Sequence, residues 1–263
     1  MSEKHWFEDT DFWEHFAPIM FDEIHWAEVS EVADAVTRLS NFNLFGETSQ
    51  DTWHKPLDSK PKILDLCCGP GRISTELARI GFAVTGVDLT ESLLAAAKED
   101  AMAEKLDIEY IRSDVRDFVR SQYFDTIVNL YISFGYFQNQ DDDLKVLNNV
   151  YESLKPGGTF IIETLGKEIA VKNFIESEWY ERDDYTVLTE YEALDSWTFL
   201  KNRWILLKDQ KQLEKIFVQR LYSASELKLL LQKAGFKNID IYGDWDESPY
   251  DHKARMLIAV CKK

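Results

Sequence analysis

The chain has 263 residues, 45% of them hydrophobic, which suits one α/β domain with additions and is too short for two large domains. Its 47 acidic and 30 basic side chains leave a formal charge of −17, which disfavours nucleic acid as a partner because phosphate backbones are repelled. No apolar run reaches membrane-spanning length, and no His, Cys or carboxylate group has metal-ligand spacing, so we expect neither a membrane nor a metal partner.

The three cysteines give no disulfide framework. Cys67 and Cys68 are adjacent, and neighbouring cysteines rarely pair with each other. The N-terminal segment is charged and aromatic and lacks the apolar core of a signal peptide. We therefore expect a cytoplasmic protein.

The first 45 residues are rich in aromatic side chains interleaved with acids, and we interpret them as a helical lid. Pro18 is expected to separate two short helices, because proline interrupts helical hydrogen bonding. Apolar residues at helical spacing predict a further helix over residues 29–39. Residues 40–61 are polar, contain Gly46, Pro56 and Pro61, and are predicted to form a connecting loop.

From Lys62 onward, short apolar runs alternate with helical patterns. The predicted strands span residues 62–66, 82–88, 108–111, 125–130 and 159–163. This alternation predicts a parallel sheet with helices on both faces. In such sheets ligands bind beyond the carboxyl ends of the strands, which is where Asp65, Asp88, Asp114 and Leu130 fall.

The pattern changes after residue 178. Residues 185–191, 197–207 and 213–221 predict three antiparallel strands, which we interpret as a flap over the site. Ser223 and Glu226 form a capping box that starts a helix, and two strands follow. The expected organisation is a lid (residues 1–45), a cofactor-binding core (46–178), a β insertion (179–222) and a completion of the core (223–263).

The turn after the first strand is the most informative motif. Gly69 and Gly71 let the backbone approach a ligand closely, because a Cβ would occupy the ligand's space. The dinucleotide fingerprint requires a third glycine, and Ser74 stands there instead. Asp65 suits an amine-bearing ligand better than a pyrophosphate, which favours S-adenosylmethionine over a nicotinamide dinucleotide.

With these motifs the chain resembles the class I S-adenosylmethionine-dependent methyltransferases. The resemblance is close over residues 62–163 and looser over 223–262, and it includes the Leu154-Lys-Pro-Gly-Gly158 segment before the fifth strand. It implies a Rossmann-like, seven-stranded, mostly parallel sheet whose last strand inserts antiparallel. The lid and the antiparallel β insertion complete the expected fold.

The resemblance also implies how the cofactor is held. The methionine portion would contact the first turn, through Asp65, Cys67, Gly69 and Gly71. Asp88 would accept hydrogen bonds from both ribose hydroxyls, a bidentate role suited to a carboxylate. Leu89 and Val115 would sandwich the adenine, with Asp114 near its exocyclic amine. The backbone carbonyl of Leu130 would lie beside the sulfonium.

Within this family, the lid, the loop around Tyr136 and the flap resemble small-molecule methyltransferases. Relatives of that type commonly have a Tyr-Asp pair over the cofactor, where this chain has Phe21-Asp22. Tyr136 would point toward the acceptor and is the candidate catalytic residue. If the acceptor needs a general base, Tyr136, Glu163 and Asp22 are candidates, and an amine acceptor needs none.

The expected activity is methyl transfer to N or O of a small molecule by direct displacement, with S-adenosylhomocysteine as product. Two alternatives stay open: a protein- or RNA-directed methyltransferase, and a non-catalytic cofactor-binding regulator. The expected assembly is a monomer or a homodimer.

Overall fold

The structure is a computed structural model, and it describes residues 5–21, 26–41, 60–182 and 184–263. Its centre is a seven-stranded sheet in the order β10-β11-β5-β4-β1-β2-β3. The strands are β1 (Lys62–Leu66), β2 (Ala83–Asp88), β3 (Ile108–Arg112), β4 (Phe124–Asn129), β5 (Leu154–Thr164), β10 (Lys237–Tyr242) and β11 (Leu257–Lys262). β11 runs antiparallel to both its neighbours, β10 and β5, and all other neighbouring strands pair in parallel, so the expected Rossmann-like topology is confirmed.

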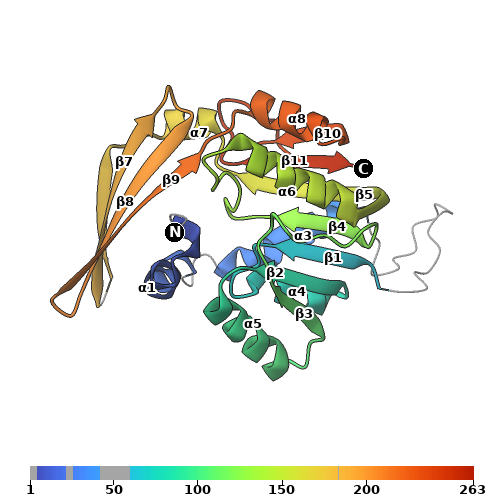
Figure 1. Cartoon of the computed structure of the whole chain (residues 1–263), viewed down its shortest axis with the longest axis horizontal. Helices are drawn as coiled ribbons and strands as arrows, with labels where there is room; N and C mark the ends of the chain where they lie inside the picture. The colour runs from blue at the N-terminus through green and yellow to red at the C-terminus, as the bar shows by residue number, and fades with distance from the viewer. Residues whose placement is uncertain (1–4, 22–25, 42–59, 183) are drawn as a thin grey trace.

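Helices cover both faces of this sheet (Figure 1). One face packs on α3 (Val29–Leu39) and α4 (Arg72–Ile80), and the other on α6 (Gln140–Ser153) and α8 (Ala224–Lys233). Side chains alternate along each central strand, so Ile63 points to the first layer and Leu64 to the second. Because both faces are buried, the strands are nearly continuous apolar runs, which is why they could be recognised in the sequence.

Two further helices flank the sheet. Helix α5 (Glu91–Ala103) packs along β2 and β3, and the short α7 (Lys167–Lys172) follows β5. Because β1, β2, β3 and β4 run parallel, the loops that follow them lie at one edge of the sheet. The candidate site is built on that edge.

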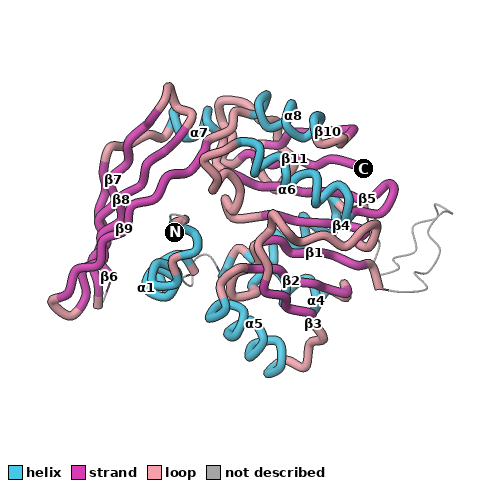
Figure 2. The backbone as a smooth tube through the Cα atoms, viewed as in Figure 1, coloured by secondary structure: helices cyan, strands magenta, loops and turns pink. Residues whose placement is uncertain are grey.

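The insertion is a separate four-stranded antiparallel sheet, which Figure 2 shows beside the core. Its strands are β6 (Ser177–Arg182), β7 (Tyr185–Leu194), β8 (Phe199–Lys208) and β9 (Lys211–Arg220). The sequence predicted three of them and missed β6. That strand lies at an edge and is largely exposed, so it lacks the alternation of buried apolar residues that identifies a strand.

The N-terminal segment lies between the insertion and the core (Figure 1). It contains a short 3₁₀ turn, η1 (Trp6–Glu8), and helix α1 (Thr10–Met20). Helix α1 continues through Pro18, so the expected break at that residue is wrong. The loss of one backbone hydrogen bond at Pro18 does not end the helix, which runs only two residues further.

The lid helix packs on the inner face of the insertion. The apolar cluster that joins them consists of Phe12, Phe16, Ile19, Val187 and Leu206. Lys215 of β9 also forms a 2.6 Å ion pair with Asp9, which caps α1. Lid and insertion are therefore one packed unit rather than two independent covers.

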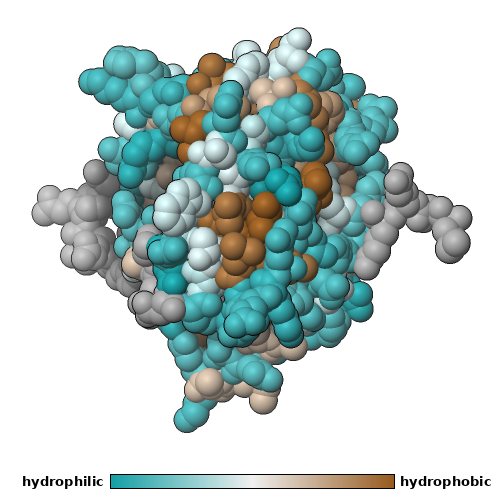
Figure 3. Space-filling view, turned by 90° about the vertical axis from the view of Figure 1, so that its left-hand side faces the viewer, coloured by the Kyte–Doolittle hydropathy of each residue, from teal (hydrophilic) through white to brown (hydrophobic). Residues whose placement is uncertain are grey.

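The outer face of the insertion, unlike the inner face that packs on the lid, is exposed. Figure 3 shows apolar residues gathered on it among hydrophilic ones, and Trp179, Leu207 and Ile216 are exposed there. Ion pairs of Arg203 with Glu190 and Glu214 cross the same face. Within the described residues, no helix is long and apolar enough to cross a membrane.

Candidate functional site

A cavity of about 570 Å³ lies where the sheet edge, the lid and the inner face of the insertion meet. Its size is typical of sites for small molecules, which range over about 300–1,000 Å³. Of the residues proposed from the sequence for this site that the structure describes, all line the cavity except Gly71. The described residues contain no group of three His, Cys, Asp or Glu side chains that could hold a metal ion.

The turn after β1 adopts left-handed backbone conformations at Cys67, Gly69 and Gly71, with φ of 62°, 53° and 80°. A Cβ at Gly71 would lie 2.5 Å from Tyr110 Oη and 2.9 Å from Ala97 Cβ. The space beside this glycine is therefore filled by protein, which corrects the expectation that a ligand occupies it. A Cβ at Gly69 would instead lie 3.4 Å from the Phe21 ring of the lid.

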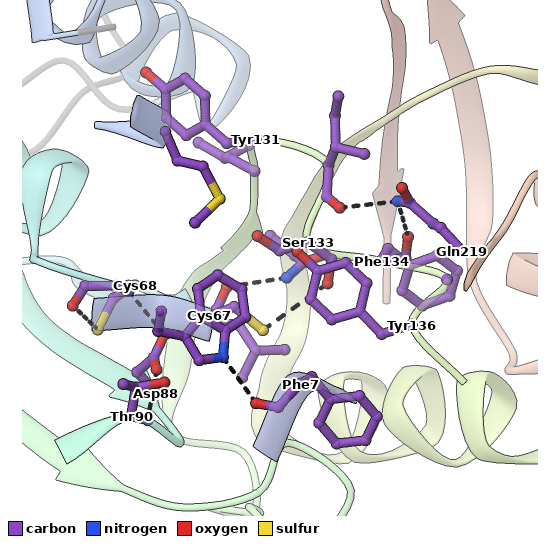
Figure 4. Close-up of a pocket in the computed structure, with 18 of the residues that line it drawn as sticks. Phe7, Cys67, Cys68, Asp88, Thr90, Tyr131, Ser133, Phe134, Tyr136 and Gln219 are labelled. Carbon is purple, nitrogen blue, oxygen red and sulfur yellow. Dashed lines mark hydrogen bonds between the residues drawn. The ribbon is translucent and has the colours of Figure 1, made fainter. Parts of the chain in front are cut away.

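Asp88 lies at the end of β2 and faces the same turn (Figure 4). Its Oδ2 accepts a 2.8 Å hydrogen bond from the Gly69 N–H, and its Oδ1 accepts one of 2.8 Å from the Thr90 N–H. Burial raises the pKa of Asp88, and the two N–H groups act in the opposite direction. Each carboxylate oxygen has two lone pairs, so the side chain can still accept further hydrogen bonds.

Asp65 is buried beneath the turn, and the Ser74 hydroxyl donates a 2.6 Å hydrogen bond to it. Desolvation raises the pKa of Asp65 to about 6, with a further contribution from the charge of Asp88, while Ser74 opposes the rise. The group is ionised at neutral pH and places a negative charge below the turn. That charge suits a cationic part of a ligand.

Asp114, after β3, does not present a free carboxylate. Burial favours its neutral form, but hydrogen bonds from Arg116 outweigh that effect and lower the pKa of Asp114. The nearest contact is 2.6 Å, from Arg116 Nη2 to Asp114 Oδ2. Arg116 also lies over the Phe137 ring, 4.8 Å from its centre. The negative charge of Asp114 is therefore balanced by Arg116, two residues further along the chain, whereas the sequence alone presents Asp114 as an unpaired acid.

The loop after β4 begins in an unusual conformation, because Tyr131 and Ile132 both have left-handed backbones with φ of 55° and 60°. Asn129, the last residue of β4, donates a 2.9 Å hydrogen bond through Nδ2 to the Leu66 carbonyl and so ties β4 to β1. Its Oδ1 is buried and has no hydrogen-bond partner among the described residues. Residues in sparsely populated conformations are concentrated at functional sites.

Strand β9 holds this loop from the insertion side. Gln219 Nε2 donates to the carbonyls of Ile132 and Phe134, both at 3.2 Å, as Figure 4 shows. The next residue, Arg220, donates its N–H to the Gly135 carbonyl at 2.7 Å. Sequence reasoning missed Gln219, because nothing local shows that a strand end 85 residues away reaches Phe134.

Tyr136 follows Gly135 and lines the cavity. Its ring lies 4.7 Å from that of Trp6 and 6.4 Å from that of Phe7, between the loop and the lid. Burial raises the pKa of Tyr136 above its usual range. The phenol is therefore protonated at neutral pH, which suits a hydrogen-bond donor and not a general base. Asp22, another candidate base, lies outside the described residues.

The loop is also anchored through Asp143, a fully buried acid in the first turn of α6. The Tyr222 hydroxyl donates a 2.7 Å hydrogen bond to Asp143 Oδ2, and Arg220 Nε lies 3.7 Å from the same oxygen. Burial raises the pKa of Asp143 to about 7, against the opposing influence of Tyr222 and Arg220. The folded protein therefore favours the protonated form of this residue.

This raised pKa makes stability depend on pH. The contribution of Asp143 is fully present below the unfolded pKa near 4 and is lost as the pH rises toward 7. We expect the free energy of unfolding of the wild type to fall by about 1–3 kcal/mol relative to that of Asp143→Asn between pH 5 and pH 8. Urea denaturation at both pH values measures this, with Asp142→Asn as control. Parallel pH profiles for Asp143→Asn and the wild type would contradict it.

The chain is similar to known proteins over most of its length. Residues 63–158 match a family described as a methyltransferase domain. A putative methyltransferase of Geobacillus sp. (strain WCH70) is 26% identical over 240 residues, covering 84% of this chain and 95% of that protein. A glycine/sarcosine N-methyltransferase of Aphanothece halophytica is 27% identical over 217 residues, covering 77% of this chain and 76% of that protein.

A solved structure agrees with the fold. An S-adenosylmethionine-dependent methyltransferase from Clostridium acetobutylicum ATCC 824 superposes with a TM-score of 0.76 at 17% identity. The superposition covers 96% of this chain and 97% of the other. The similarity therefore extends beyond the central sheet to the added elements.

Proposed function

Because the chain belongs to the class I S-adenosylmethionine-dependent methyltransferases, we propose that it methylates a nitrogen or oxygen atom of a small-molecule acceptor. One observation carries the small-molecule part of the proposal. The cavity that contains the expected cofactor residues is covered by the lid and the insertion, whose packed aromatic side chains leave a chamber rather than an open docking face. The glycine/sarcosine N-methyltransferase similarity supports the same class of acceptor.

The residues present fit the cofactor. Asn129 Oδ1 is a buried acceptor without a partner among the described residues, and it borders the cavity beside the turn after β1. The ammonium group of the cofactor would supply the donor that this atom lacks. Asp65 adds negative charge below the same turn, and Asp88 has free lone pairs for a ribose diol.

The cofactor, when bound, supplies a methyl group on a sulfonium, which is already activated for displacement. We assign the protein's part to alignment and to the exclusion of water. Leu89 and Val115 would flank the adenine, and the backbone carbonyl of Leu130 would border the reacting end. Tyr136 orients the acceptor by donating a hydrogen bond. The lid aromatics keep water from the chamber.

We also place the protein in the cytoplasm, in keeping with its free thiols at Cys67, Cys68 and Cys261.

Two measurements test this proposal. S-adenosylhomocysteine should raise the melting temperature of the protein, whereas NAD should not, because the turn lacks the third glycine of a dinucleotide site. Incubation with labelled cofactor and a metabolite extract should then move label into small molecules, each gaining the mass of one methylene. Label found only in protein or RNA would refute the small-molecule acceptor, and a cofactor-bound protein that labels nothing would indicate a regulator.

A further inference from the structure

The walls of the chamber differ sharply in charge. Among the described residues that line it, those from the insertion carry no acidic or basic side chain, and those from the lid carry one, Glu28; the others include Trp6, Phe12, Tyr180, Asn202, Trp204 and Phe217. Among the described residues that line the cavity, the basic one is Arg72. Its guanidinium lies over the Tyr131 ring, 4.3 Å from the ring centre. A phosphate or carboxylate on the acceptor would therefore lack an ionic partner on the insertion side.

Glu163 is the buried acid at the acceptor end, whereas Glu28, whose charge also acts on it, is exposed. It lies near the carboxyl end of β5, one position beyond the pairing of Ile162 with Asn129, and thus beside Leu130 of the neighbouring strand. β5 continues into α7 and then the insertion, so this strand end belongs to the acceptor side. Asp65 lies near the end of β1, Asp88 ends β2 and Asp114 follows β3, on the other side.

The surroundings of Glu163 hold it in place and keep it partly desolvated. The side chain is 7% exposed and lines the cavity. The left-handed turn at Tyr131 and Ile132 directs backbone N–H groups toward it, with a distance of 3.3 Å from the Ile132 nitrogen to Glu163 Oε2. The charged or titratable groups that face it are Glu28 at the start of α3 and the phenols of Tyr131 and Tyr136. Arg72, whose guanidinium lies over the Tyr131 ring, is the basic residue of the described lining.

We propose that the acceptor is a small amine without a phosphate or carboxylate group, and that Glu163 binds its ammonium and takes its proton before methyl transfer. This inference rests on the proposed function and names the substrate class of the same site. Aromatic walls stabilise a cation through their ring quadrupoles, and a carboxylate completes an ammonium site. The backbone N–H at Ile132 keeps the carboxylate oriented while its charge changes.

The reaction balances without any further reagent. Proton transfer from the ammonium to the Glu163 carboxylate leaves a neutral amine and a carboxylic acid. The nitrogen lone pair then forms the new N–C bond while the C–S bond breaks, and the electrons of that bond remain on sulfur. The methylated ammonium departs, and Glu163 returns its proton to water. The pKa of Glu163, which burial raises to about 7, matches this exchange at neutral pH.

Binding to the protein loaded with S-adenosylhomocysteine tests the inference directly. The probes are 2-phenylethylamine, 2-phenylethanol, which lacks the charge, and phenylalanine, which adds a carboxylate. Calorimetry should show the amine binding at least about tenfold more tightly than either of the others. Its affinity should increase as the pH rises through about 7, because Glu163 ionises while the amine remains charged.

The variant Glu163→Gln keeps the shape of the side chain and an oxygen for the Ile132 N–H. We expect it to lose the preference for the amine and its pH dependence, with 2-phenylethanol and S-adenosylhomocysteine binding within about twofold of wild type. Glu192→Gln, on the exposed side of β7 and paired with Lys201, is the matched control and should change nothing. An amine that binds no better than the alcohol, or a preference that survives in Glu163→Gln, would overturn the inference. A wild type that does not bind S-adenosylhomocysteine would instead refute the proposed function.

Discussion

Replacing Asp88 with asparagine is expected to weaken binding of S-adenosylhomocysteine by about 100-fold, because the ribose diol loses a charged, bidentate acceptor. The existing hydrogen bonds from Gly69 and Thr90 already hold the carboxylate in place, so little ordering cost accompanies binding. An asparagine side chain retains one acceptor oxygen but presents an amide where the second was. Calorimetric titration of the purified variant measures the loss.

A ligand comparison shows whether the effect arises at the ribose. Wild type should bind adenosine more tightly than 3′-deoxyadenosine, and Asp88→Asn should not distinguish them. Asp117→Asn, a highly exposed acid paired with Lys145, controls for the loss of one surface charge and should behave as wild type. If Asp88→Asn still prefers adenosine, the carboxylate does not contact the diol.

Replacing Gly135 with alanine is expected to destabilise the fold and to misplace the loop that carries Tyr136. Gly135 has φ of +92°, and a Cβ there would collide with the carbonyl oxygen of Arg220. That oxygen belongs to the backbone of β9, which is fixed to the loop by the bond from the Arg220 N–H to the Gly135 carbonyl. We expect a cost of about 2–4 kcal/mol, from backbone strain and from separating the two segments.

Gly157 provides a matched control, since its φ is +77° and nothing lies within 4 Å of an added Cβ. Gly157→Ala should show the backbone strain alone, about 1–2 kcal/mol in urea denaturation. In Gly135→Ala, affinity for S-adenosylhomocysteine should remain close to wild type while acceptor turnover falls, because β9 and the loop belong to the acceptor side. Equal destabilisation by the two substitutions would show that contact with Arg220 does not constrain the loop.

The added elements are connected to one another and to the loop after β4. Gln219 and Arg220 join β9 to the loop after β4, Asp143 and Tyr222 secure the base of that loop, and Lys215 ties β9 to the lid through Asp9. A change at one of these contacts is therefore transmitted to the loop that carries Tyr136. This arrangement explains why the insertion can influence the chemistry although its strands lie outside the main sheet.

The central sheet could be predicted from the sequence because its determinants are local. Runs such as residues 62–66 are apolar because both faces of the strand are buried, and the helices between them repeat with a period that one sequence shows directly. The positions of Asp65 and Asp88 at strand ends followed from the same alternation. These features, with the resemblance they supported, established the fold class and the cofactor.

The tertiary structure decided contacts between residues that are remote in sequence. It also decided pairings between near neighbours that no sequence pattern indicates. Tyr110 fills the space beside Gly71, and Gln219 reaches the carbonyls of the β4 loop, although no local pattern links these residues. Arg116 neutralises Asp114, and the polar edge strand β6 forms by pairing with β7. Backbone hydrogen bonds and close packing depend on where the chain returns in space, so the strand-end positions of Asp65 and Asp88 could be predicted from the sequence and the contacts of Gly71 and of the β4 loop could not.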